Sequence, residues 1–265
     1  MDDHASDEDN HAYLAKCIQC MDVCYCYIHN FIFDVQLALD NDCGSVMKKF
    51  RHAFVNLPQL TEEYIDGRRH YKTPEGNVYP SVTTILSRLP NESLREWQKR
   101  VGEEEVNRVS KVAARRGTNL HEICERYLLN EEKPMRGHMP DVQGMFRELC
   151  KHIDRIDEIY AIEAQLYCDT YQFAGRCDVI GTFDGHPAIM DFKTTKSEVN
   201  SSMDKVKKYF MQLSAYSLAF EERTGHEINL GVLLFASNET EPSCIQADLS
   251  KYKKEFISVL DHGEI

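Results

Sequence analysis

Hydrophobic and polar positions along the second half of the chain follow periods that predict strands and helices in turn. The apolar runs on either side of Asp184-Gly185 predict two strands joined as a hairpin, because Asp-Gly is a strong signal for a two-residue turn. The continuous apolar run 228–235 is typical of a strand inside a sheet. Further patterns predict strands at 159–168 and about 244–249, and helices near 141–154, 204–223 and 251–261.

The first half of the chain is richer in helical patterns. Residues 69–84 predict a small hairpin with a Pro-Glu-Gly turn. Asn91 is a predicted N-cap for a charged helix that contains Trp97, and a second helical pattern follows Arg115-Arg116-Gly117 over 118–129. The order of these elements predicts an α/β fold with a mixed central β-sheet flanked by helices.

The hairpin at Asp184-Gly185 places two acidic residues opposite each other. Counting outward from the turn pairs Phe183 with His186 and then Asp178 with Asp191. Side chains alternate along a strand, so Lys193 shares the face of Asp191. Carboxylates directly opposite each other repel and destabilise a sheet. A cation between them would remove this penalty.

The first 46 residues differ from the rest of the chain. They hold nine acidic residues, one basic residue and five of the ten cysteines, and an apolar segment within them is a predicted helix. We therefore expect residues 1–46 to form an extension outside the working fold, and residues 47–265 to form the working domain. The N-terminus has neither a secretory nor an organellar signal pattern, and no apolar run approaches a membrane span, so we expect a cytoplasmic protein with no membrane partner.

The distribution of charge along the chain is compatible with a nucleic-acid partner. The net charge is −12, but most of it comes from the first 46 residues, and residues 47–265 hold 34 acidic and 30 basic residues, a net of −4. Basic positions such as Lys205, Lys207 and Lys208 are therefore available to meet phosphates.

The Asp-x-Lys triplet Asp191–Lys193 suggests metal-assisted chemistry. Carboxylates hold Mg²⁺ or Mn²⁺ through oxygen, and such an ion activates water and stabilises charge on a phosphate. A lysine on the same face orients the water or neutralises the phosphate oxygens. The alternative is an exposed hairpin with an ordinary salt bridge, because short triplets of this kind are common.

Other candidate residues lie upstream and downstream of the hairpin. His121 and Glu125 are four apart on a predicted helix, as are Gln212 and Tyr216, so each pair shares one side. Glu163 alternates with apolar neighbours on the strand before the hairpin. Each has a structural alternative. His121 and Glu125 could be an ordinary surface pair, and Gln212 and Tyr216 could belong to a core helix with a buried tyrosine. Glu163 could lie on a solvated strand face.

The sequence gives little support for two other kinds of site. The four cysteines between Cys17 and Cys26 match no common zinc spacing, although metal ligation there is an alternative. A glycine-rich phosphate loop, a G-x-S-x-G elbow and a zinc-protease helix are absent from the sequence, which argues against P-loop nucleotide hydrolysis and serine-hydrolase chemistry.

Taken together, these motifs resemble the RecB-like branch of the PD-(D/E)XK nuclease superfamily. The match runs in order through Gly117–His121, Glu163, Gly175–Asp178, Asp191–Thr194 and Gln212–Tyr216. The upstream segment PSVTTIL at 80–86 narrows the resemblance to the exonucleases of tailed phages and their mitochondrial relative, with the phage type the better fit.

The resemblance implies a PD-(D/E)XK core and a role for each matching residue. Asp178, Asp191 and His121 would be metal ligands, helped by the carbonyl of Phe192, with Glu163 as an outer or second-metal ligand. Lys193 would be the catalytic lysine, and Gln212 and Tyr216 would support the site. Contacts to DNA are expected from Ser81, Thr83, Arg115, Arg116, Lys205, Lys207 and Lys208. Some relatives carry an iron–sulfur cluster, but Cys244 is the only cysteine after the core, which makes such a cluster improbable.

The expected function is therefore a Mg²⁺- or Mn²⁺-dependent deoxyribonuclease of the exonuclease type. It would hydrolyse single-stranded or end-containing DNA in phage-type metabolism, in the host cytoplasm. One alternative is a structure-specific flap endonuclease on the same site. The other is a nucleic-acid-binding module that kept the fold without activity.

Overall fold

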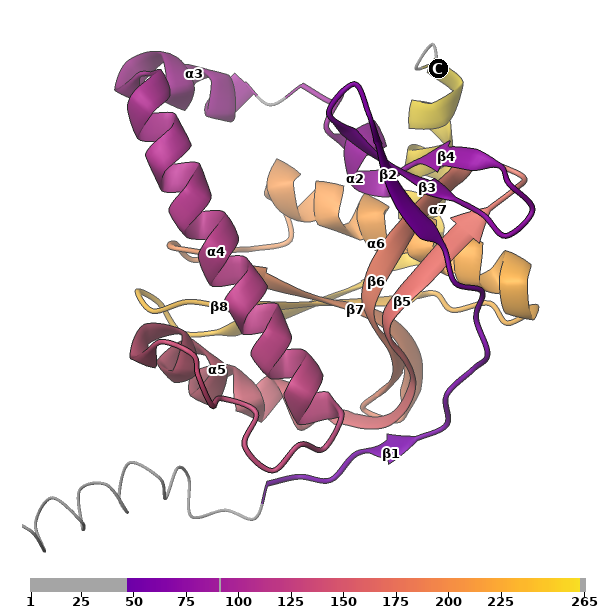
Figure 1. The fold of residues 1–265 in the computed structure, drawn as a ribbon. Coiled ribbons are helices and arrows are strands. Elements are labelled where there is room, and N and C mark those ends of the chain that lie inside the picture. The colour runs from indigo at the N-terminus through magenta and orange to yellow at the C-terminus, as the bar shows by residue number, and fades with distance from the viewer. Residues whose placement is uncertain (1–46, 91, 263–265) are drawn as a thin grey trace, which may run out of the picture. The chain divides into compact units, whose positions relative to one another are not determined.

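The computed structural model describes residues 47–90 and 92–262 (Figure 1). The predicted extension 1–46 with its cysteines, and the predicted cap Asn91, lie outside the described residues.

A six-stranded sheet forms the centre of the described fold, in the order β1-β5-β6-β7-β8-β9. β1 is parallel to β5 and β7 is parallel to β8, whereas the other neighbours are antiparallel. The predicted mixed sheet is thereby confirmed. The strands are β1 Arg51–His52, β5 Ile156–Cys168, β6 Phe173–Phe183, β7 His186–Thr194, β8 Leu230–Ala236 and β9 Ser243–Asp248.

Helices cover the sheet on both sides, as predicted. α4 (Glu103–Leu128) and α5 (Pro140–Ile153) contact each other and the strands β7 and β8, whereas α6 (Asp204–Thr224) contacts α7 (Leu249–His262) and β5. Figure 1 shows α5 and α6 on opposite sides of the sheet. α6 ends at Gly225, whose φ of 74° is the left-handed conformation that favours glycine at a helix end.

The start of α4 differs from the sequence prediction. A helix is predicted from residue 118, but α4 begins at Glu103 and continues through Gly117. A glycine inside a helix costs about 1 kcal/mol relative to alanine, which the helical turns on both sides absorb. The predicted boundary before residue 118 is therefore wrong, and α4 is a long helix that carries His121 across the sheet.

A second, three-stranded sheet contains β2 (Thr61–Ile65), β3 (Arg68–Lys72) and β4 (Val78–Pro80). Its β3–β4 hairpin confirms the prediction for 69–84, but β2 was not predicted. Asp66 and Gly67, with φ of 50° and 72°, form the turn between β2 and β3, so Asp-Gly was the signal for this strand too.

This small sheet packs on the main sheet through buried tyrosines. Tyr71 and Tyr79 form a cluster with Leu60, Tyr167 and Ala174. A backbone bridge joins Ser81, just after β4, to Ala174 of β6. The short helices α2 (Val82–Leu86) and α3 (Glu92–Val101) follow, and α2 contacts α6 and β6. None of the helices within residues 47–90 and 92–262 has both the length and the apolar character that a membrane crossing requires.

Candidate active site

The β6–β7 hairpin has the register that the sequence predicts. Ladder pairs run from Phe183 and His186 at the turn to Val179 and Met190. Asp178 and Asp191 occupy the next position, and they are buried, with 9% and 1% of their surface exposed. Oδ2 of Asp178 accepts a hydrogen bond of 2.8 Å from the backbone N–H of Phe192, so this side chain bridges to the partner strand where the regular ladder stops.

His121 on α4 lies between two of the predicted oxygen ligands. Its Nδ1 is 3.3 Å from Oδ2 of Asp178, and its Nε2 is 2.7 Å from the carbonyl oxygen of Phe192. Burial lowers the pKa of His121, but the Asp178 carboxylate outweighs burial and raises this pKa to about 9. Burial likewise raises the pKa of Asp178, but the charge and hydrogen bond of His121 hold it below its usual range. A protonated imidazole therefore supplies the positive charge beside Asp178.

Glu163 on β5 completes a cluster of potential ligands. The flanking pairs Ile162–Val179 and Ala164–Cys177 set it opposite Asp178. One ligand atom each from His121, Glu163 and Asp178 lies within 4.8 Å of the others. Burial and then the negative charge of Asp178 raise the pKa of Glu163 to about 7, which agrees with two acidic groups crowded at one point.

The backbone at Glu163 is strained. Its φ is 49°, in the left-handed region that costs a non-glycine residue about 1 kcal/mol or more. The regular ladder pairs on both sides of it hold this conformation in place. Strain of this kind in the middle of a strand is typical of a functional position.

Lys193 forms an ion pair with Asp191 beside this cluster. Burial and the charge of Asp178 raise the pKa of Asp191 to about 6, although Lys193 opposes them. Burial lowers the pKa of Lys193, but its two acidic neighbours outweigh that effect and raise it. The ammonium group therefore stays charged within a buried acidic pair.

Gln212 and Tyr216 of α6 support this ion pair. Nε2 of Gln212 lies 3.3 Å from Oδ1 of Asp191 and 3.0 Å from the Tyr216 hydroxyl. Oε1 of Gln212 accepts a hydrogen bond of 3.4 Å from Nζ of Lys193. The four-residue spacing that placed Gln212 and Tyr216 on one side of a helix in the sequence thus brings both to the site.

The donor set of this cluster fits a divalent metal ion. The donor set contains two carboxylates and one imidazole, with the Phe192 carbonyl beside them. Mg²⁺ and Mn²⁺ prefer such a set, in which most ligand atoms are oxygen. The arrangement differs from the predicted roles in one respect. Glu163 lies in the tightest group with His121 and Asp178, whereas Asp191 is engaged with Lys193 and Gln212.

The residues predicted to contact DNA lie on several elements outside the cluster. Arg115 and Arg116 are on α4 and the three lysines are on the first turns of α6, and the described contacts of the cluster include none of them. Thr83 is exposed and accepts a hydrogen bond of 3.0 Å from Nη2 of Arg69. The prediction for Ser81 needs correction, because this residue is 1% exposed and its hydroxyl caps α2 by accepting from the N–H of Thr84.

Two residues near the site were missed by the sequence analysis. The ring of Tyr209 lies 4.7 Å from Nζ of Lys193, and its spacing of three from Gln212 was the signal. Arg176 on β6 forms an ion pair of 2.8 Å with Glu163, and it is two residues from Asp178, so strand alternation places both on one face.

Gly175 directly follows Ala174, the residue that the backbone bridge joins to Ser81, and it leaves room for Tyr216. A Cβ at this position would lie 2.6 Å from Cε1 of the Tyr216 ring, which is buried. We expect Gly175→Ala to lower the free energy of unfolding by about 2 kcal/mol, because the ring has no space to move aside. Urea unfolding followed by circular dichroism measures this change.

Gly117→Ala is the matched control for Gly175→Ala. A Cβ at Gly117 meets nothing within 4 Å, and the residue lies inside α4. This substitution should leave stability unchanged or raise it by up to about 1 kcal/mol. Equal stability of the Gly175→Ala variant and the unsubstituted protein would contradict the close packing between Gly175 and Tyr216.

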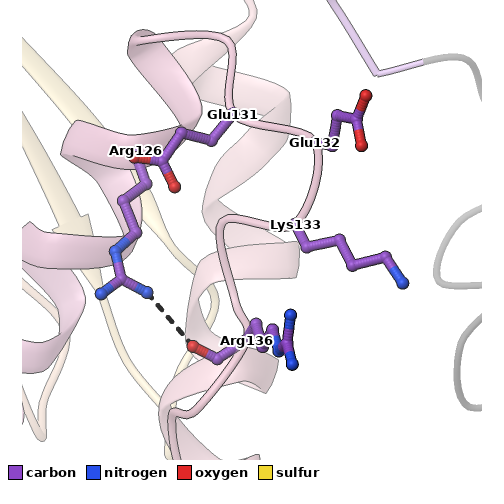
Figure 2. A pocket seen from close by; sticks show the side chains of 5 residues that line it. All are labelled: Arg126, Glu131, Glu132, Lys133 and Arg136. Carbon is purple, nitrogen blue, oxygen red and sulfur yellow. Dashed lines mark hydrogen bonds between the residues drawn. The ribbon is translucent and has the colours of Figure 1, made fainter.

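A concave region with a volume of about 500 Å³ lies on the loop after α4 (Figure 2). It is lined by Arg126, Glu131, Glu132, Lys133 and Arg136. Nη1 of Arg126 donates a hydrogen bond of 3.1 Å to the carbonyl oxygen of Arg136 across it, as Figure 2 shows. This charged pocket contains none of the cluster residues, so it is separate from the candidate site.

Comparison with known proteins finds a human sequence relative and several solved structures, among them one from Eubacterium rectale and that of SSO0001. Human mitochondrial genome maintenance exonuclease 1 is 23% identical over 181 residues, 63% of this chain, and the chain spans about half (52%) of that protein's length. A "putative exonuclease" from Eubacterium rectale is 14% identical with a TM-score of 0.41, over 56% of this chain and 63% of that one. The structure of SSO0001 is 14% identical with a TM-score of 0.34, over 70% of this chain and 77% of that one.

The family assignment comes from a sequence model of the PD-(D/E)XK nuclease superfamily, which matches residues 84–259. This range includes the hairpin acids Asp178 and Asp191, the lysine Lys193, and the partners that α4, β5 and α6 bring to them. The chain therefore belongs to the PD-(D/E)XK nuclease superfamily.

Proposed function

We propose that this protein is a metal-dependent DNA exonuclease that hydrolyses phosphodiester bonds in single-stranded or end-containing DNA. The observation that carries the proposal is the meeting of His121, Glu163 and Asp178 within 4.8 Å, beside the buried Lys193–Asp191 pair. Membership of a nuclease superfamily and the similarity to a human exonuclease support it.

Two cluster carboxylates and His121 would hold the ion, with Asp191 and the Phe192 carbonyl as further ligands. When bound, Mg²⁺ or Mn²⁺ lowers the pKa of a water molecule and stabilises negative charge on the phosphate. Ligation through the imidazole requires His121 to lose its proton, so its elevated pKa makes metal binding release a proton.

Lys193 would act directly on the reacting atoms. Its ammonium is held by Asp191 on one side and Gln212 on another, with the face of Tyr209 at 4.7 Å. These contacts restrict a flexible side chain to one direction, in which it can donate a hydrogen bond to the attacking water or to a phosphate oxygen. A charge fixed in advance stabilises a transition state more than one that must reorganise.

Basic residues on α4 and α6, the two helices that contribute side chains to the site, would contact the DNA backbone. Arg115 and Arg116 on α4 and Lys205, Lys207 and Lys208 on α6 would contact phosphates, which predicts binding that weakens as salt rises. Phage-type DNA metabolism in the host cytoplasm is the setting that we propose for this activity.

A covalently closed single-stranded circle and the same molecule made linear distinguish the candidate functions. With Mg²⁺ we expect the linear strand to be degraded and the circle to persist, because an exonuclease needs an end. Cleavage of the circle would favour the endonuclease alternative. Absence of Mg²⁺- or Mn²⁺-dependent cleavage of either substrate would favour a binding module without activity.

A further inference from the structure

The small sheet presents two different faces, which its register defines. Tyr64 pairs with Arg69 and Glu62 pairs with Tyr71, so these four residues share one face. Tyr71 is fully buried against the main sheet, which makes this the inner face. Ile65 and its partner Arg68 lie on the opposite, outer face. Adjacent residues of one hairpin therefore point in opposite directions.

The inner face extends past the buried tyrosines towards the β2–β3 turn. There the Tyr64 side chain is 67% exposed, although it is on the same face as Tyr71. Its hydroxyl donates a hydrogen bond of 2.7 Å to Glu62, which fixes the orientation of the ring. An exposed aromatic ring held in one orientation is a surface on which a flat group can stack.

Arg69 is the cross-strand partner of Tyr64 in the β2–β3 ladder. The hydrogen bond to Glu62 raises the pKa of the Tyr64 phenol, and the positive charges of Arg69 and Arg176 act against it. Arg69 is anchored by its hydrogen bond of 3.0 Å to Thr83 and lies over the ring of Tyr71. The two arginines come from different sheets, Arg69 from β3 of the small sheet and Arg176 from β6 of the main sheet.

This group of residues is continuous with the candidate active site. Arg176 is on β6, two residues after Ala174, the strand position that the small sheet joins through Ser81. Its guanidinium forms the 2.8 Å ion pair with Glu163, a member of the ligand cluster. Figure 1 shows the small sheet beside β6, which leads from it to the hairpin with the acidic residues.

We propose that Tyr64, Arg69 and Arg176 form a binding track for single-stranded DNA that leads to the ligand cluster. An unpaired base stacks on Tyr64, and the phosphates on either side are held by Arg69 and Arg176. This inference rests on the proposed nuclease function, and it names the form of substrate that the site receives.

The chemistry of the track selects a single strand. Base–aromatic stacking requires an open base face, which a duplex covers with the neighbouring base pairs, and it tolerates any sequence. Arginine binds phosphate with two parallel hydrogen bonds, so two arginines fix the direction of the backbone. The ion pair with Glu163 keeps Arg176 beside the cluster, where the strand would enter.

The test compares neighbouring residues on the two faces of the hairpin. Fluorescence anisotropy measures the Kd for a labelled 20-nucleotide single strand and for its duplex, in EDTA so that cleavage does not run. Tyr64→Ala should weaken single-strand binding about tenfold and change duplex binding less than twofold. Arg69→Ala should weaken single-strand binding about fivefold and reduce the salt dependence by about one phosphate contact.

Two further variants separate stacking from general effects. Tyr64→Phe keeps the ring and loses the hydrogen bond to Glu62, so it should bind within twofold of the unsubstituted protein. Arg68→Ala removes the same charge from the outer face and should also stay within twofold. Circular dichroism checks the fold of each variant, and the high exposure of Tyr64 makes a folding defect easy to distinguish.

The outcomes separate this inference from the proposed function. If the unsubstituted protein cleaves linear DNA but Arg69→Ala and Arg68→Ala weaken binding equally, the track is wrong and the nuclease proposal stands. Equal losses in Tyr64→Phe and Tyr64→Ala would also overturn stacking on this ring. If the unsubstituted protein neither binds nor cleaves single strands, the proposed function fails as well.

Discussion

Replacing Lys193 with alanine is expected to abolish DNA cleavage, with a loss of about 10²–10³-fold or more in the rate. The ammonium is buried, paired with Asp191 and bonded to Gln212, so no other basic side chain in the described contacts takes its place. Removing a preorganised donor that faces developing charge costs a factor of this size. Release of label from an end-labelled single strand in Mg²⁺ measures the rate.

Lys196→Ala is the control for this substitution. Lys196 is three residues further along the chain and exposed. Its ion pair with Glu239 is long, at 4.0 Å, and lies at the surface, so its loss should leave cleavage unchanged. Asp191 takes up a proton more readily once Lys193 is gone, which limits the damage to the fold. Circular dichroism and thermal melting identify a temperature at which both variants are folded. Digestion by folded Lys193→Ala at the unsubstituted rate would defeat the role of this lysine.

Replacing Asp178 with asparagine is expected to remove metal binding and cleavage together. An asparagine carbonyl can still accept the hydrogen bond from the N–H of Phe192, so the local backbone is preserved. The negative charge that holds His121 and would hold the ion is lost. Mn²⁺ should raise the melting temperature of the unsubstituted protein, because a ligand of the folded state stabilises it, and should leave this variant unchanged.

Asp184→Asn provides the matched change at the other end of the same hairpin. Asp184 is in the turn, with a φ of 49° that asparagine tolerates, and its ion pair with Arg155 is at the surface. This variant should keep the full response to Mn²⁺ and the full cleavage rate. A Mn²⁺ response that survives in Asp178→Asn would exclude this carboxylate as a metal ligand.

The local part of the site could be predicted from the sequence because one turn sets it. Asp184-Gly185 requires positive φ at both residues, and this conformation fixes the register of the β6–β7 ladder. The opposition of Asp178 and Asp191 follows by counting. Helical spacing placed Gln212 and Tyr216 on one side of α6 for a similar local reason.

The remote part of the site could be found only by resemblance. The contact between His121 and the Phe192 carbonyl joins α4 to β7 across 71 positions of sequence, and no spacing rule reaches that far. The backbone twist at Glu163 and its pair with Arg176 depend on how β5 and β6 meet. Such features arise from tertiary packing, which overrides local preference.

Errors in the prediction of the fold have physical causes of the same kind. Gly117 looked like a helix boundary, but long helical turns on both sides carry α4 through it. The signal for β2 was present in Asp66-Gly67, yet its strand pattern is short and exposed and lacks alternation. Ser81 resembled a DNA contact by motif, whereas its hydroxyl is used in capping α2.

We expect the acidic hairpin and its partners to bind a divalent ion and to cleave DNA from an end. The most direct test incubates end-labelled single-stranded DNA with Mg²⁺ and follows the release of short products, with Asp191→Ala as the comparison. We predict release by the unsubstituted protein in Mg²⁺, and none in EDTA or with folded Asp191→Ala. Equal release in EDTA or by Asp191→Ala would contradict this expectation.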